Sequence, residues 1–103
     1  MQTTERPRGS FSPHGVRVPP QDVDAERALL GSLMLKPESV HEIADSISPD
    51  SFYADKHRVV FEAMLSLMER GEPVDIITVS AELKSRGNLE RSGGSASLAE
   101  IVS

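Results

Sequence analysis

The apolar residues of this 103-residue chain recur at helical spacing from Val23 onward, and this periodicity constrains the fold more than any other feature. Only the segment Val74 to Val79 has the composition of a β-strand. A lone strand without a partner is not stable, so we interpret Asp75–Arg86 as a helix that Asp75 caps. With aromatic residues at 4% and no cysteine, the core must consist of Leu, Val, Ile, Met and Ala. The sequence therefore predicts one compact all-α domain.

The first 20 residues differ in composition from the rest of the chain. They contain four of the seven prolines and a net charge of +2, whereas the remaining 83 residues carry −7. We expect residues 1–18 to form a disordered basic tail and residues 19–103 to form the folded domain. Binding to a phosphate backbone normally requires an excess of Lys and Arg, so direct binding of nucleic acid by the folded part is not expected.

The opening helix is predicted to begin after Asp22, which is a good N-cap, and to end at Lys36-Pro37. Asp24 and Glu26 lie in its first turn, where the helix dipole favours negative charge and where we expect an exposed surface. Because the later residues are almost all apolar, the helix should be a buried central element. Gly31 is interpreted as a point of close packing against a crossing helix.

Four more helical segments are expected besides Asp75–Arg86. They are Pro37 to about Ser46, a single turn that follows Ser48, Asp55 to about Arg70, and Ser95 to Val102. Phe52 and Tyr53 are predicted to point into the core. A single core is predicted to contain Leu29, Leu33, Phe61, Met64 and Leu83.

No stretch carries a complete catalytic, cofactor or metal site. GNLERSGG (87–94) lacks the spacing and the lysine of a phosphate-binding loop. His41 and Asp45 have the spacing of a helical zinc motif but no third ligand, so a solvated helix face is the better interpretation. The serines of GGSAS (93–97) read as a helix N-cap rather than as a nucleophile elbow, which needs a preceding strand. His57 is expected at the surface or half packed.

Seven sequence elements together resemble the N-terminal domain of bacterial replicative DNA helicases of the DnaB type. The resemblance runs from about Val18 to Ser103. The family pattern has a proline pair, an acidic A-E, L-L-G, F-Y-x-x-x-H-x-x-[IV]-F, G-x-P-[IV]-D-x-[IV]-T, a leucine before a [KR]-x-G-type turn, and G-G-x-x-x-L. The elements stand here, among them Pro19-Pro20, Ala25-Glu26, Leu29-Leu30-Gly31, Phe52-Tyr53 with His57 and Phe61, Gly71–Thr78, and Gly93-Gly94 with Leu98.

The resemblance implies an all-helical head domain that helps to form the N-terminal collar of a hexameric ring. In that family the collar is a trimer of dimers and receives primase. The partners it implies are primase, other helicase subunits and a helicase loader. ATP, Mg²⁺ and DNA translocation belong to a C-terminal motor, so no cofactor is expected in this chain and any enzymatic activity would be that of an ATP-dependent parent helicase.

The chain departs from the family in two respects, because the motor and the helical hairpin that follows the head are missing. We therefore interpret it as a fragment cut before the hairpin rather than as a stand-alone remnant. In such a fragment partner binding should be weak and the chain mostly monomeric. With no apolar run near the roughly 20 residues that span a bilayer and no secretory signal, we expect a soluble cytoplasmic protein.

Two functions from other classes stay open, a stand-alone helical interaction protein and a helix-turn-helix DNA binder. The net charge of −7 argues against the second. The candidate partner-binding residues are Asp22, Asp24 and Glu26, and the structural alternative for all three is capping and pairing with the helix dipole.

Overall fold

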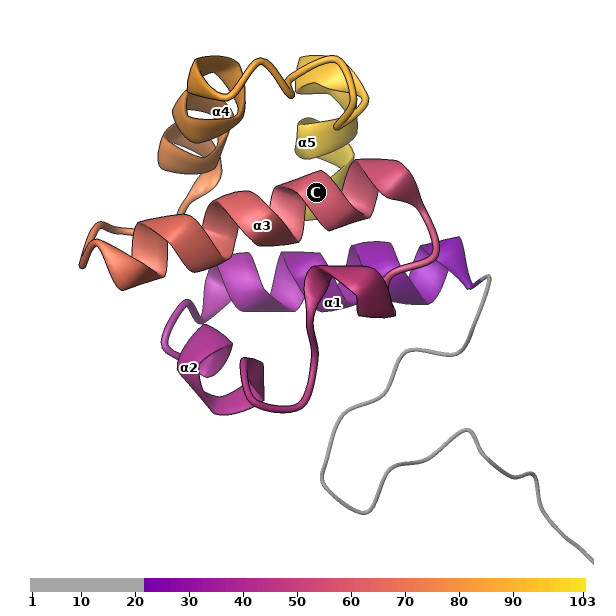
Figure 1. Ribbon diagram of the computed structural model, residues 1–103. Helices are drawn as coiled ribbons and strands as arrows, with labels where there is room; N and C mark the ends of the chain where they lie inside the picture. The colour runs from indigo at the N-terminus through magenta and orange to yellow at the C-terminus, as the bar shows by residue number, and fades with distance from the viewer. Residues whose placement is uncertain (1–21) are drawn as a thin grey trace, which may run out of the picture.

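The structure of the protein is a computed structural model that describes residues 22–103, and the predicted tail lies outside this range (Figure 1). Within these residues the chain forms five α-helices and one 3-10 helix and no β-strand. The elements are α1 (Val23–Leu35), α2 (Ser39–Ile43), η1 (Pro49–Ser51), α3 (Asp55–Glu69), α4 (Ile76–Ser85) and α5 (Gly94–Val102). The all-α prediction is confirmed.

The strand-like segment is helical, as predicted. Its N-terminus is fixed by a reciprocal pair of hydrogen bonds: the Thr78 backbone N–H donates to Asp75 Oδ1 at 2.8 Å, and the Asp75 backbone N–H donates to Thr78 Oγ1 at 2.9 Å. This capping box satisfies two backbone donors that a helix end would otherwise leave without partners. It explains why a segment rich in β-branched residues starts a helix here.

Two element boundaries differ from the prediction. The helix expected from Pro37 to Ser46 is shorter, because Lys36–Glu38 form a turn before α2 begins at Ser39. The last helix begins at Gly94, and its N-cap is Gly93 rather than a serine. Gly93 has φ of +92°, a left-handed conformation that glycine adopts without strain. Because glycine has no side chain, no side-chain hydrogen bond caps this helix.

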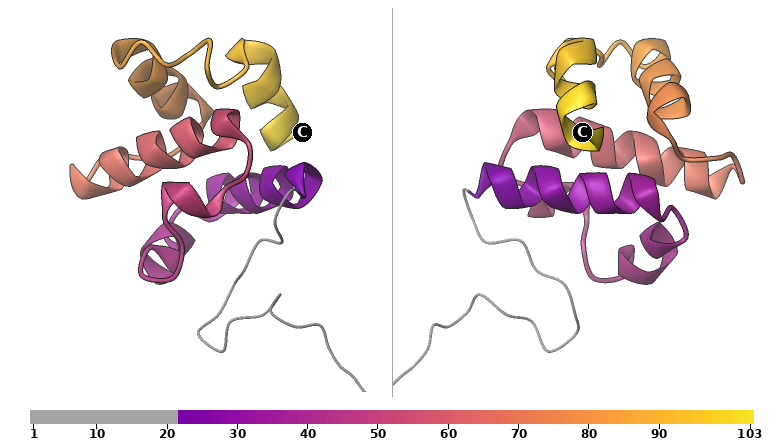
Figure 2. Two further views of the ribbon diagram at one scale, coloured as in Figure 1. Left: turned by 45° about the vertical axis from the view of Figure 1, so that its right-hand side comes forward. Right: turned by 180° about the vertical axis from the view of Figure 1, so that it is seen from behind.

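α1 and α3 lie side by side and form the centre of the domain (Figure 1). α4 and α5 lie on one side of α3, and α2 and η1 lie on the other. Figure 2 shows the same arrangement from two further directions. α5 also packs against α1, so the last helix closes the domain onto the first.

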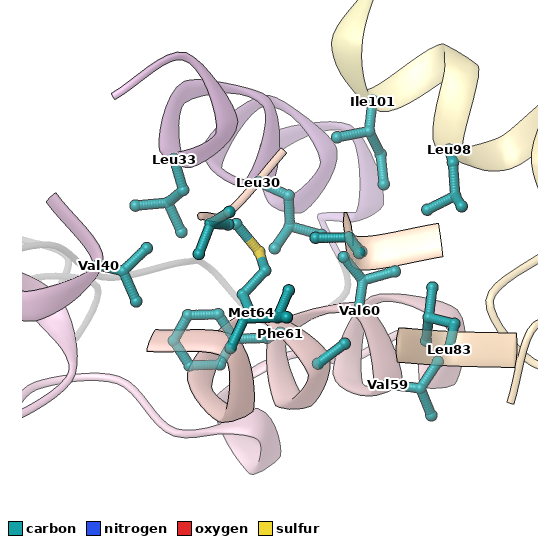
Figure 3. Close-up of a cluster of buried hydrophobic side chains, with 14 of the residues drawn as sticks. Leu30, Leu33, Val40, Val59, Val60, Phe61, Met64, Leu83, Leu98 and Ile101 are labelled. Atoms are coloured by element: carbon teal, nitrogen blue, oxygen red, sulfur yellow. The ribbon is translucent and has the colours of Figure 1, made fainter. Parts of the chain in front are cut away.

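The hydrophobic core is continuous across all five α-helices (Figure 3). Four of the five residues predicted to meet are fully buried in it, and the fifth, Leu29, is partly buried against it. The helix predicted to be a buried central element is central but buried only in part, because Leu35 at the C-terminal end of α1 is 87% exposed. The buried apolar residues are Leu30, Leu33, Val40, Ile47, Phe52, Val59, Val60, Phe61, Ala63, Met64, Leu67, Val74, Val79, Leu83, Leu98 and Ile101.

Gly31 is the point where α5 crosses α1, as the sequence predicts. A Cβ atom added at Gly31 would overlap the backbone carbonyl oxygen of Ile101. Because the obstacle is backbone, a larger side chain could be accommodated only if α5 moved away.

Gly31→Ala is therefore expected to destabilise the domain by about 1–3 kcal/mol, the usual range for overpacking, although alanine favours helix more than glycine does. Ser32→Ala at the next, exposed position is the control for helix propensity. The measurement is urea denaturation of both variants. Equal or greater stability of Gly31→Ala would show that the two helices do not make this contact.

Candidate protein-interaction site

The three acidic residues singled out from the sequence occupy the first turn of α1 and its N-cap, but they have different environments. Asp22 caps the helix, because its Oδ1 accepts the backbone N–H of Ala25 at 2.9 Å. The Asp24 side chain is 90% exposed and makes only a loose pair with Arg27 at 3.6 Å. Glu26 is 1% exposed. The expectation that Glu26 projects into solvent is wrong.

The Glu26 carboxylate is buried at the start of α3, where three donors surround it. It accepts the backbone N–H of Tyr53, the backbone N–H of Ala54 at 3.2 Å, and a hydrogen bond from His57 Nδ1 at 2.9 Å. Ala54 is the N-cap of α3 and has no side-chain acceptor of its own. Glu26 therefore does for α3 what a capping side chain normally does, and its charge lies where the helix dipole favours an anion.

His57 was expected at the surface or half packed, and this expectation is also wrong, because the residue is 1% exposed. Its place in the first turn of α3 turns the ring toward α1, where Glu26 supplies an acceptor. One signal in the sequence pointed to this pairing. Glu26 precedes Leu30 and Leu33 by four and seven residues, so it lies on the buried face of α1 with them.

The loop before α3 is held from both sides. Glu26 binds its N–H groups, and Arg58 donates to the Phe52 carbonyl at 2.8 Å and to the Tyr53 carbonyl at 3.1 Å. Phe52 is buried, as predicted, and its ring centre lies 5.2 Å from that of Phe61. Tyr53 was predicted to be in the core, but it is 55% exposed, since successive residues of an extended segment point to opposite sides.

The first turn of α1 also presents two acidic side chains to solvent, and we call Asp22 and Asp24 the first-turn surface. Exposed carboxylates attract cationic partners. Glu26 separately anchors the backbone of Tyr53, whose exposed ring offers a large contact area. No group on this surface has the environment of a nucleophile or an acid–base catalyst. The arrangement suits protein binding rather than chemistry.

Ion pairs connect the other end of α3 to α4. Arg70 NH2 lies 2.7 Å from Glu82 Oε1, and Arg86 Nε lies 2.8 Å from Glu82 Oε2. Hydrogen bonds from these two guanidinium groups lower the pKa of Glu82 from its ordinary 4.5 to about 2. A carboxyl group whose pKa is depressed by folding stabilises the folded state above its unfolded pKa, and this contribution disappears as the pH falls through the folded pKa.

The stability difference between wild type and Glu82→Gln should therefore shrink as the pH falls from about 4.5 to about 2. Thermal melting of both proteins across this range is the measurement. Glu100→Gln removes an exposed carboxylate that has no ion pair among residues 22–103, and it should not change the pH profile. Parallel profiles for wild type and Glu82→Gln would contradict the prediction.

The other motifs considered in the sequence do not assemble into a site in the described part of the chain. Between residues 22 and 103, no three His, Cys, Asp or Glu side chains are placed to hold a metal ion. Ser97 is buried in α5, whose N-terminus follows a turn and not a strand. None of the helices within residues 22–103 combines the length and the apolar character needed to cross a membrane.

Comparison with known proteins agrees with the resemblance drawn from the motifs. Residues 18–103 match the family described as DnaB-like helicase N terminal domain. The chain is 42% identical over 86 residues to the replicative DNA helicase DnaB of Geobacillus stearothermophilus, and equally so to the replicative DNA helicase DnaC of Bacillus subtilis. Each match covers 84% of this chain and 19% of the relative, so this chain spans a small part of those proteins.

Comparison of the fold with solved structures leads to the same family. The structure is similar to the crystal structure of the N-terminal domain of DnaB helicase from Mycobacterium tuberculosis, with a TM-score of 0.75 and 40% sequence identity. The similarity covers 82% of this chain and 59% of that structure. The family that matches is not one of helix-turn-helix DNA binders. The chain belongs to the DnaB-like helicase N-terminal domain family.

Proposed function

We propose that this domain has no catalytic role of its own and serves a replicative DNA helicase in two ways. It takes part in the assembly of the N-terminal collar of the hexameric ring, and it docks primase during DNA replication. ATP hydrolysis and DNA unwinding would then belong to a motor domain elsewhere in the helicase. Other helicase subunits, primase and a helicase loader are the proposed partners, and the cytoplasm is the proposed location.

The observation that carries this proposal is the match of residues 18–103 to the helicase N-terminal family, which covers the whole described domain. The first-turn surface supports it independently. It presents the exposed Asp24, which makes only a loose pair with Arg27, whereas the buried Glu26 is used inside the fold. Asp22 and Asp24 are therefore the proposed partner-binding acids, and Glu26 has the structural role of anchoring the segment that leads into α3.

Asp24→Lys is expected to weaken binding of the cognate primase C-terminal domain by about tenfold, equivalent to about 1.4 kcal/mol. The reason is the replacement of an attractive charge by a repulsive one at the surface. Fluorescence anisotropy with labelled primase domain measures the dissociation constant. Glu90→Lys, the same change on the exposed loop between α4 and α5, is the matched control and should have little effect.

Three outcomes separate the possible explanations of primase binding. If wild type binds and Asp24→Lys binds equally well, primase docks elsewhere on the domain. If Asp24→Lys and Glu90→Lys weaken binding equally, the effect is one of net charge and not of a defined surface. If wild type does not bind while a full-length DnaB helicase binds its own primase under the same conditions, this domain alone is not the docking unit.

A further inference from the structure

A groove of about 550 Å³ lies at the opposite end of α1 from the first-turn surface. Figure 1 shows α2 and the C-terminal ends of α1 and α3 together at this end of the molecule. The 13 residues of α1 separate the two surfaces by roughly 20 Å at 1.5 Å per residue. The groove is lined by the end of α1, the start of α2, and the connection between α3 and α4.

The polar side chains that line the groove are mainly acidic. Three are the carboxylates Glu38, Glu72 and Asp75, His41 is the fourth, and no Lys or Arg lines it. Glu72 pairs with Arg70, and Asp75 caps α4. The side-chain carboxylate of Glu38 is exposed and has no hydrogen bond or ion pair with any residue between 22 and 103. The groove therefore presents a carboxylate that the described domain does not use.

The rest of the lining is mainly apolar and adaptable. Met34 from α1 and Met68 from α3 are both partly buried and pack against the core, and Val74 is buried. Methionine side chains adjust to differently shaped apolar partners, which makes them common at binding surfaces. Leu35, which follows Met34 in the chain, is 87% exposed, although an isolated domain gains nothing from such exposure.

We propose that this groove docks a segment of another protein in which Lys or Arg residues flank one or two apolar side chains. The apolar side chains would contact the methionines, and the cations would pair with Glu38 and its neighbours at the rim. This surface is distinct from the first-turn surface, so the proposal goes beyond primase docking there and does not depend on it.

Charge complementarity selects this occupant over the others. Nucleic acid and anionic membrane surfaces would be repelled by the Glu38 carboxylate, which no cation among residues 22–103 neutralises. A second copy of the domain would bring a net charge of −7 from residues 21–103 to an acidic groove. A basic segment with an apolar anchor can pair its cations with the carboxylates of the groove and pack its apolar side chain against the methionines.

The test begins with a randomised 12-residue peptide library displayed on phage, selected against the full chain. We expect the selected peptides to be enriched in Lys and Arg around Leu, Met or Phe. A synthetic copy of the selected peptide should shift the NMR amide signals of the groove residues. Its affinity should fall at least fivefold in Glu38→Lys and should be unchanged in Asp24→Lys, the matched charge reversal at the other end of α1.

Several results would overturn the proposal. They are the selection of no peptides, selection of peptides without basic residues, NMR shifts outside the groove, or equal losses in the two charge-reversed variants. Concentration-dependent dimerisation that Glu38→Lys abolishes would assign the groove to a second copy instead. Loss of primase binding in Asp24→Lys tests the first-turn surface separately, so failure of one proposal leaves the other intact.

Discussion

Glu26→Ala is expected to lower the free energy of unfolding by about 3 kcal/mol or more, because each buried hydrogen-bond donor left without an acceptor costs about 1–3 kcal/mol. The substitution leaves the backbone N–H groups of Tyr53 and Ala54 and the Nδ1 atom of His57 without their acceptor. Each donor is then left without an acceptor at a position that water reaches poorly. The substitution also removes the anion at the N-terminus of α3, which is a second source of destabilisation.

Urea denaturation measures this effect, with Glu38→Ala as the control. The Glu38 side chain is exposed and has no partner within the described residues, so its substitution should cost less than about 0.5 kcal/mol. Glu26→Gln should have an intermediate effect, because it keeps one acceptor oxygen but places an NH₂ group among donors. A loss below 1 kcal/mol for Glu26→Ala would mean that the carboxylate does not organise the start of α3.

Leu33→Ala is expected to cost about 2–5 kcal/mol, a large share of the stability of a small domain. Leu33 is 2% exposed and lies in the core cluster with residues of α2, α3 and α4 (Figure 3). Truncation removes apolar contacts and leaves a cavity that the surrounding helices fill only in part.

Leu35→Ala provides a matched control, because it makes the same chemical change two residues away on a side chain that is 87% exposed. Its cost should stay below about 0.5 kcal/mol. Denaturation curves of the two variants, recorded side by side, give the difference directly. Similar costs for both would show that the buried face of α1 has been assigned incorrectly.

The helices could be predicted from the sequence because their signals are local. Leucines at helical spacing define α1, Asp75 and Thr78 form the capping box of α4, and the small Gly31 marks a helix crossing. The limits of α2 could not be predicted so well. Its five residues are held by packing against α3 more than by their own helical preference, and short helices are marginal without such contacts.

The candidate site was predicted less accurately than the fold because its main interaction joins residues that are far apart in the chain. Glu26 and His57 are 31 positions apart, and an acidic residue in a first turn is usually exposed. The family pattern contains both residues but does not state that they meet. Tyr53 was misplaced for a related reason, because two adjacent aromatics suggest a core unless the backbone direction is known.

In the proposed function this domain is an interaction module, and the chemistry of the helicase belongs to another domain. Isothermal titration calorimetry of the purified chain tests it directly, first with the C-terminal domain of the cognate primase and then with ATP and Mg²⁺. We predict saturable binding of primase and neither binding nor hydrolysis of ATP. ATP turnover that follows the chain through a second purification, or no heat with primase when a full-length DnaB helicase binds its own, would contradict the claim.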